Sequence, residues 1–389
     1  MAQPNKKRES LESKLGRPIK GALSTYSKKI RTQISKFRRN HEGWGATSIL
    51  VELELEKGFA KNELPSVDAV NRYLKEQGFI KTKIPSGKFP VGKCKTKIKR
   101  AHDLWEMDAE GAVYVKGLGY ISNINIKDSK SKIHCMAFPV HVKGQMSQPK
   151  TESYLWALRL AFEEWGLPKA IQVDRDSVFI DNTSRSPFPS QVYLWLLGLG
   201  VKLCFIDVPP PQKQAMVERS HQTLNRQTIK GQSYECWKQL FQFTNKRRKR
   251  LNENLPNRSL GGQPPLIANP KAAHSGRFYS HEQEEQLFEM NRVNKLLAKC
   301  RWYRKLTKVK TISLHGRIYY LKNLKRGVQI QVQIKFCNRA KKLIFRDAKE
   351  QIVAKIPFQN ISTLDIMGAT SKKLISIRKK LFRDRDFPL

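Results

Sequence analysis

Three acidic residues lie where this 389-residue sequence predicts the end of a strand or the start of a helix. Asp108 lies in the segment that starts at Leu104, Asp174 follows the apolar segment Ala170–Val173, and Glu218 lies near the start of a predicted helix. Mg²⁺ and Mn²⁺ prefer carboxylate oxygens. Three carboxylates can hold two such ions about 3.5–4 Å apart, and such a pair stabilises the attacking and leaving oxygens of a phosphodiester. The three acids therefore predict phosphodiester cleavage and transfer with two Mg²⁺ ions, or Mn²⁺ in their place.

Other acids nearby in the sequence compete for the same roles. A single aspartate can be an ordinary surface carboxylate. Glu106 shares strand parity with Asp108, and Asp176 lies two residues after Asp174. The further competitors are Asp103, Glu110 and Asp181. Asp108, Asp174 and Glu218 are favoured because they occur in the right order, two at strand ends and one at the start of a helix.

The elements that must position these acids lie within 101–250. Periodicity predicts strands at 104–109, 120–126, 133–140, 169–173 and 201–206, and helices at 151–165, 191–199 and 214–229. Three strands followed by helix, strand, helix, strand and helix is the order of a ribonuclease H-like fold, a mixed α/β architecture. We therefore assign 101–250 to a ribonuclease H-like catalytic core with a mixed sheet. If the strands that carry Asp108 and Asp174 are neighbours, their carboxylates can share one ion.

A helical region precedes this core. Residues 28–80 predict three short helices, the last of which is capped by Ser66, and this pattern suits a helix-turn-helix that binds DNA. A small helical bundle without DNA contacts is the alternative. Residues 1–27 read as a basic arm, and 81–100 as a basic linker broken by prolines and glycines.

Three further segments follow the core. Residues 251–308 read as a helical connector that includes a polar helix over 282–299. Residues 309–362 hold short strands separated by turns, which is the size of a small β-barrel. Residues 363–389 read as a basic tail. The predicted fold class is therefore multidomain α/β, with an N-terminal helix-turn-helix, a ribonuclease H-like core and a C-terminal β-barrel.

The charge balance points to a polyanion as partner. The chain has 74 Lys and Arg against 33 Asp and Glu, a formal net charge of +41. Repulsion among so many positive charges destabilises a compact fold unless a polyanion offsets it, and nucleic acid is the usual polyanion. The six cysteines are scattered without a Cys-x-x-Cys pair, and neither a membrane span nor a secretory signal is recognisable. We expect a bacterial, cytoplasmic, nucleoid-associated protein.

Candidate DNA contacts come from four places in the sequence. They are the exposed side of the third predicted helix, the basic linker, the helix that begins near Glu218, and the densest charge run, 246–250. Residues three, four and seven positions after Glu218 share one helix face that could line a groove for the DNA backbone. The candidates are Asn71, Arg72, Lys75, Lys95, Lys97, Arg219, His221, Gln222, Asn225, Arg247, Arg248 and Arg250.

Motifs in three parts of the chain resemble those of integrase-type DDE transposases. The stretch 161–174 is similar to the helix-Gly-x-Pro-strand-Asp passage of this family, and 210–219 to its Pro-x-x-x-Gly-x-Val-Glu-Arg motif. The stretch 257–264 resembles the segment that follows the catalytic domain, and 44–78 the helix-turn-helix region ahead of it. The chain departs from the family at Arg175-Asp176, at Ala215-Met216 and at His221, but no acid is lost.

The resemblance implies a two-step reaction on double-stranded DNA. Water cleaves at the ends of a mobile element to expose 3′-hydroxyls, and these then attack target DNA. It also implies that the protein acts as a homo-oligomer on paired ends. Whether an accessory ATPase selects targets stays open. Two alternatives remain open: a catalytically silent DNA-binding derivative that regulates transposition, and a ribonuclease H-like nuclease that cleaves without joining.

Overall fold

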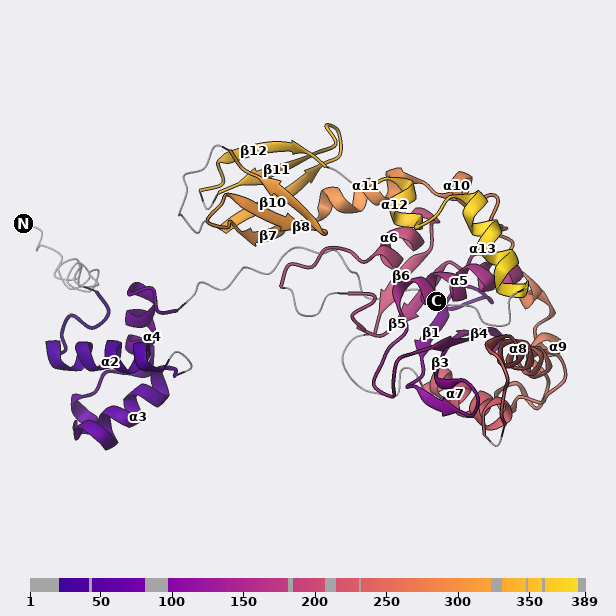
Figure 1. The fold of residues 1–389 in the computed structure, drawn as a ribbon, viewed down its shortest axis with the longest axis horizontal. Helices are drawn as coiled ribbons and strands as arrows, with labels where there is room; N and C mark the ends of the chain where they lie inside the picture. Colours follow the sequence, from indigo (N-terminus) through magenta and orange to yellow (C-terminus); the bar gives the residue numbers. More distant parts are fainter. Residues whose placement is uncertain are drawn as a thin grey trace, which may run out of the picture. The chain divides into compact units, whose positions relative to one another are not determined.

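The computed structural model describes residues 21–41, 44–80, 97–180, 185–206, 215–230, 232–322, 331–347, 349–358 and 361–383, and their side chains except at 48, 215–218 and 331. These residues fall into two compact units, one ending at residue 80 and the other starting at residue 97 (Figure 1). Most of the predicted basic arm and of the linker, including Lys95, lies outside the described residues.

The N-terminal unit contains the three predicted helices. They are α2 (Lys28–Asn40), α3 (Ala46–Lys57) and α4 (Val67–Glu76), with a 3₁₀ turn, η1 (Lys61–Glu63), before α4. Their apolar faces share one core. Ser27 and Ser66 cap α2 and α4, since each hydroxyl accepts a hydrogen bond from the backbone N–H three residues on, at 3.3 and 3.2 Å.

The second unit is built on a mixed sheet. Its strands are β1 (Trp105–Ala109), β2 (Val113–Val115), β3 (Gly119–Asp128), β4 (His134–His141), β5 (Ala170–Val173) and β6 (Lys202–Phe205). The longer strands follow the order β4-β3-β1-β5-β6, and the short β2 pairs with β3 beside β1. Strands β3 and β4 are antiparallel to their neighbours, whereas β1, β5 and β6 run parallel. The prediction of a mixed α/β core is confirmed, and the strands that carry Asp108 and Asp174 are neighbours.

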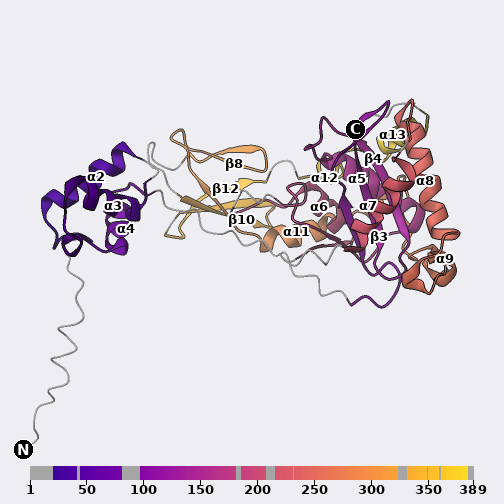
Figure 2. The ribbon, with the colours of Figure 1, turned by 90° about the horizontal axis from the view of Figure 1, so that it is seen from below.

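Helices cover both faces of this sheet (Figures 1 and 2). Helix α5 (Thr151–Trp165) packs under β3 and β4, and α6 (Gln191–Gly198) lies against β6. Helix α7 (Ala215–Thr228) lies over β1 and β3 on the opposite face, beside α8 (Trp237–Glu253), which packs along β4. On β1, Trp105 and Met107 are buried on the α5 side, so Glu106 and Asp108 face α7.

The predicted connector is packed onto the core. After η3 (Arg258–Leu260), α9 (Pro265–Ala268) and η4 (Pro270–Ala273), the single helix expected at 282–299 is broken into α10 (Glu284–Leu287) and α11 (Met290–Lys299). Glu284 is buried and accepts two hydrogen bonds of 2.8 Å from the Arg159 guanidinium of α5. Breaking a buried pair of this kind costs about 3–5 kcal/mol. The sequence of 282–299 is polar, but the charge of Glu284 within it is paired inside the protein.

The C-terminal β region begins before the predicted boundary at 309. One sheet has the order β12-β11-β10-β7, and β8 and β9 form a separate hairpin. Strand β7 pairs with β10 although it lies within the predicted connector. The six strands are β7 (Trp302–Lys305), β8 (Thr311–Leu314), β9 (Arg317–Tyr320), β10 (Gln331–Cys337), β11 (Lys342–Arg346) and β12 (Ile352–Pro357).

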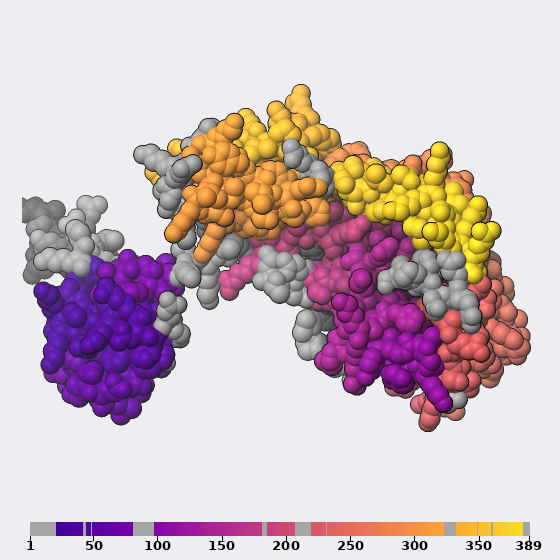
Figure 3. Space-filling view, viewed as in Figure 1, coloured from indigo at the N-terminus to yellow at the C-terminus, as the bar shows by residue number. Residues whose placement is uncertain are grey.

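The described part of the predicted basic tail (363–389) is two packed helices, α12 (Thr363–Met367) and α13 (Ser371–Arg383). Leu374 and Leu381 of α13 are buried, and Arg378 donates to Glu163 of α5 at 2.8 Å. In Figure 3 this yellow segment covers part of the core surface. Residues 363–383 of the predicted basic tail are therefore packed helices with buried apolar side chains. No helix in the part of the chain that is described has the length and apolar character needed to span a bilayer.

Candidate active site

Asp108 and Asp174 lie side by side on neighbouring parallel strands. Trp105 pairs with Ile171 and Glu106 pairs with Gln172 between β1 and β5. The same register places Asp108 beside Asp174, which follows the last residue of β5. Because parallel strands in register direct paired side chains to the same face, both carboxylates lie on the face that α7 covers.

The two carboxylates interact electrostatically. The pKa of Asp174 is raised, first by burial and then by the negative charges of Asp108 and Asp176, although the backbone N–H of Asp176 donates to its carboxylate at 3.0 Å. A divalent cation bound between Asp108 and Asp174 would remove this repulsion. The donor set of the two aspartates therefore fits Mg²⁺ or Mn²⁺.

Glu218 belongs to α7, but its side chain lies outside the described residues. The backbone of α7 contacts β1, which carries Asp108, and the neighbouring strand β3. Among the described side chains, no group of three or more His, Cys, Asp or Glu has an arrangement that could hold a metal ion. The third carboxylate of the predicted triad thus remains a prediction.

His221 contacts Asp108 directly. Its Nε2 lies 3.2 Å from Asp108 Oδ2, and its Nδ1 lies 2.6 Å from the amide of Asn125, the residue opposite Asp108 on β3. With the Asn125 amide donating to Nδ1, the proton of the neutral ring is on Nε2, which then donates to Asp108. His221 is almost fully buried, so it orients a carboxylate and does not line an open groove as predicted.

One turn further along α7, Asn225 donates a hydrogen bond to Glu110. Burial is the main cause of the raised pKa of Glu110. Asn225 therefore also faces the sheet, and its predicted role as a DNA contact is not supported. Sequence reasoning missed Asn125 altogether and treated Glu110 only as a competitor. The even spacing of Asp108 and Glu110 on one strand was the signal for their shared face.

Arg248 was predicted to contact DNA, and the structure contradicts this. Its side chain is 0% exposed and lies between α8, β4 and α5. It pairs with Glu164 at 2.6 Å and donates to the carbonyls of His134 and Cys135 at 2.9 and 3.1 Å. The charge run 246–250 suggested a solvated face, but on a helix one residue of such a run must point inward.

The remaining candidate contacts differ in exposure. Arg247 is half-buried and donates to the Gln227 side chain at 3.0 Å, and Lys95 lies outside the described residues. The exposed candidates are Asn71, Arg72, Lys75, Lys97, Arg219, Gln222 and Arg250. Exposure is compatible with DNA contact at these seven positions but does not test it.

Part of the chain that contributes to this site matches a known protein family. Residues 199–265 match the family model described as "Integrase core domain", and this stretch includes Val217-Glu218-Arg219. Among solved structures, the chain is similar to the HTLV-2 integrase catalytic core domain in complex with magnesium, with 15% identity, 43% of this chain and 97% of that chain covered, and a TM-score of 0.32. It is also similar to the BIV integrase catalytic core domain, with 14% identity, 44% and 95% covered, and a TM-score of 0.32. Over residues 199–265, the family match confirms the resemblance to integrase-type DDE transposases that the motifs predicted.

Proposed function

We propose that this chain is a DDE transposase that joins the ends of a mobile DNA element to target DNA. Water cleaves a phosphodiester at the element end and releases a 3′-hydroxyl. That hydroxyl attacks a phosphodiester of the target, and the displaced 3′-oxygen leaves. One phosphodiester is broken and one is formed in the second step, so no external energy source is needed for joining.

One observation carries this proposal. Asp108 and Asp174 lie in register on the adjacent parallel strands β1 and β5, and the helix that bears Glu218 packs over β1 and its other neighbour, β3. This arrangement brings two acids and the start of a third element to one sheet face. The family match over 199–265 supports the same reading independently.

Asp108, Asp174 and Glu218 are the residues that would hold two divalent ions. When bound, such ions stabilise negative charge on the phosphoryl oxygens and lower the pKa of a bound water or hydroxyl. The protein itself fixes the carboxylates: β1 and β5 set the positions of the two aspartates, and His221 holds one oxygen of Asp108. Pre-set side chains of this kind avoid reorganisation during the reaction.

We propose that DNA contacts outside the core come from the N-terminal unit and from the β region. Helix α4 exposes Asn71, Arg72 and Lys75 on the side away from its apolar core, which suits a recognition helix. The two sheets of residues 302–357 would act as a small barrel-like DNA-binding domain. A homo-oligomer on paired DNA ends remains an expectation from the family resemblance, and the need for an accessory ATPase stays open.

A strand-transfer assay tests the proposal. The full chain, Mg²⁺ and target DNA are mixed with a duplex that carries the terminal inverted repeat found beside the gene and ends in a 3′-hydroxyl. We expect joined products from the wild type and none from Asp108→Asn, Asp174→Asn or Glu218→Gln, with DNA binding retained. Asp176→Asn is the matched control, because Asp176 caps the loop after Asp174 by accepting from Val178.

The outcomes separate the alternatives. Cleavage without joining by the wild type would indicate a nuclease, and DNA binding without either reaction would indicate a silent regulator. Joining by Asp174→Asn together with loss of joining in Asp176→Asn would transfer the catalytic role to Asp176 and refute our assignment.

A further inference from the structure

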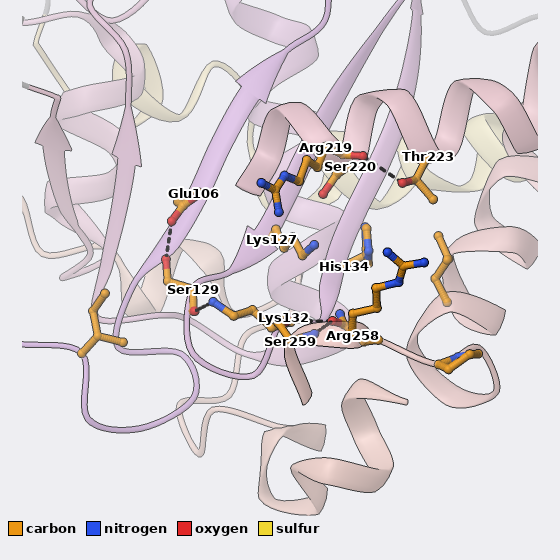
Figure 4. A pocket seen from close by; sticks show the side chains of 14 residues that line it. Glu106, Lys127, Ser129, Lys132, His134, Arg219, Ser220, Thr223, Arg258 and Ser259 are labelled. Carbon is orange, nitrogen blue, oxygen red and sulfur yellow. Dashed lines mark hydrogen bonds between the residues drawn. The ribbon is translucent and has the colours of Figure 1, made fainter. Parts of the chain in front are cut away.

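A cavity of about 680 Å³ is lined by Glu106, which precedes Asp108 by two residues on β1 and points to the same face of the sheet. Residues of β1, β3, the first half of α7 and the 256–259 segment line it. Figure 4 shows Arg219 reaching from α7 toward Lys127, with Arg258 on the other side of the space. The cavity is thus continuous with the proposed active-site face, but it involves residues that the proposed chemistry does not use.

The lining is strongly cationic. Lys127, Lys132, Arg219 and Arg258 line the cavity, and Glu106 is the one carboxylate among the described lining residues. Glu106 accepts a hydrogen bond from Ser129 at 2.9 Å, and Lys132 donates to the Ser129 carbonyl at 2.6 Å. The side chain of Ser129 and the ammonium of Lys132 are therefore engaged at one end of the space, as Figure 4 shows.

Lys127 is the unusual member of this group. It is largely buried, with 8% of the residue exposed. Burial lowers its pKa to about 8, and the charge of Lys132 acts in the same direction, although the negative charge of Glu106 on the neighbouring strand acts against it. A buried cation is costly unless anions offset its charge. The pKa of Lys127 stays low although Glu106 is nearby, so the charge of this one carboxylate offsets only part of the cost of burial.

We propose that this cavity binds a backbone phosphate of DNA, close to the phosphodiester that reacts. Lys127 would supply a point charge, and Arg219 and Arg258 would supply guanidinium donors that match phosphate oxygens. Arg219 and Arg258 are exposed, so an extended polyanion can reach the buried ammonium from outside. DNA is favoured over a free phosphate because the cavity opens on the sheet face that carries Asp108, two residues after the lining residue Glu106. This inference rests on the proposed function.

The test measures how DNA affinity depends on salt. Binding of the full chain to a fluorescein-labelled duplex of about 30 base pairs is followed by anisotropy at several salt concentrations. Each phosphate contact contributes about 0.9 to the slope of log K against log salt concentration. We expect Lys127→Met to lower the slope by about 1 and to weaken binding severalfold at low salt. Lys202→Met is the matched control, because Lys202 is exposed on β6 and outside the cavity.

A second arm uses inorganic phosphate as the probe. Thermal unfolding is measured in phosphate and in chloride at equal ionic strength, and the wild type is expected to gain stability in phosphate that Lys127→Met does not gain. An unchanged salt slope in a folded Lys127→Met variant would overturn the DNA assignment, even if free phosphate still bound. If strand transfer fails in the wild type but the slope falls as expected, the proposed function fails and the subsite stands.

Discussion

Lys127 gives a prediction that separates stability from function. A lysine whose charge is only partly offset by Glu106 should cost stability in the DNA-free protein, so its removal should stabilise the fold while weakening DNA binding. Lys127→Met tests this, because methionine keeps an unbranched side chain of similar length and fits the apolar stem of the lysine. Residues kept at a cost to stability are typical of functional sites.

The magnitude follows from the lowered pKa. Lys127 has a pKa of about 8 in the folded protein against 10.5 for the free side chain. Since one pKa unit corresponds to about 1.4 kcal/mol, the charged form costs about 3 kcal/mol below pH 8. Between pH 8 and 10.5 the unfolded chain holds a proton that the folded protein has lost, so the stability of the wild type rises with pH over this window. Below pH 8 the cost is fully present, and above 10.5 it is gone.

Urea unfolding of both proteins at several values from pH 7 to pH 10.5 measures this difference. We expect Lys127→Met to be more stable than the wild type by about 3 kcal/mol at pH 7 and by almost nothing from this cause at pH 10.5. Titration of the other lysines affects both proteins equally, and Lys202→Met should differ from the wild type by less than about 0.5 kcal/mol throughout. A Lys127→Met variant that is less stable at pH 7, or a difference that does not change with pH, would refute the picture of a cation that is only partly compensated.

Two further predictions concern residues that were first taken for DNA contacts. Arg248→Ala should lower the free energy of unfolding by about 3–5 kcal/mol, because Glu164 and two strand carbonyls lose their partner, and it should leave the DNA affinity of the folded protein unchanged. The exposed Arg250→Ala should instead weaken DNA binding and leave stability unchanged. Equal losses of DNA affinity in both variants would contradict this. His221→Ala should raise the Mg²⁺ concentration for half-maximal thermal stabilisation by about 10–100-fold, since the orientation of Asp108 is lost. In His221→Gln the amide can still donate to Asp108, so part of the Mg²⁺ affinity should return. An unchanged midpoint in the alanine variant would exclude a positioning role.

The elements around the acids could be predicted because their signals are local. Helix α5 occupies 151–165 as predicted, since its apolar periodicity and Gly166 mark both the element and its end. Strands β1 and β5 were likewise expected within a residue of their bounds. The sequence left open whether these two strands are neighbours, and the structure pairs β1 with β5 and so places Asp108 beside Asp174.

The sequence-based predictions failed where packing between distant segments determines whether a residue is buried or an element forms. The sequence around Arg248 is uniformly basic, and only the position of the helix against β4 and α5 selects which arginine is buried. Helix α13 also reads as a basic tail, although its leucines cover the core. Strand β7 was missed because it is four residues long and gains its partner, β10, from a segment some thirty residues later.

The two faces of the central sheet carry different kinds of side chain, apolar on one and polar on the other, and the proposed active site lies on the polar face. On the α5 side β1 places Trp105 and Met107 in a continuous apolar core. Under α7 the same strands place charged and amide groups, and four buried atoms there lack a hydrogen-bond partner among the described residues: Glu106 Oε2, Glu110 Oε2, Asn125 Oδ1 and Asn225 Oδ1. Buried polar atoms are almost always paired in folded proteins. Under the proposed function, the cations and phosphates of the reaction would meet these atoms on the α7 face. Substitutions on the α5 face should therefore change stability first, and those on the α7 face should change activity first.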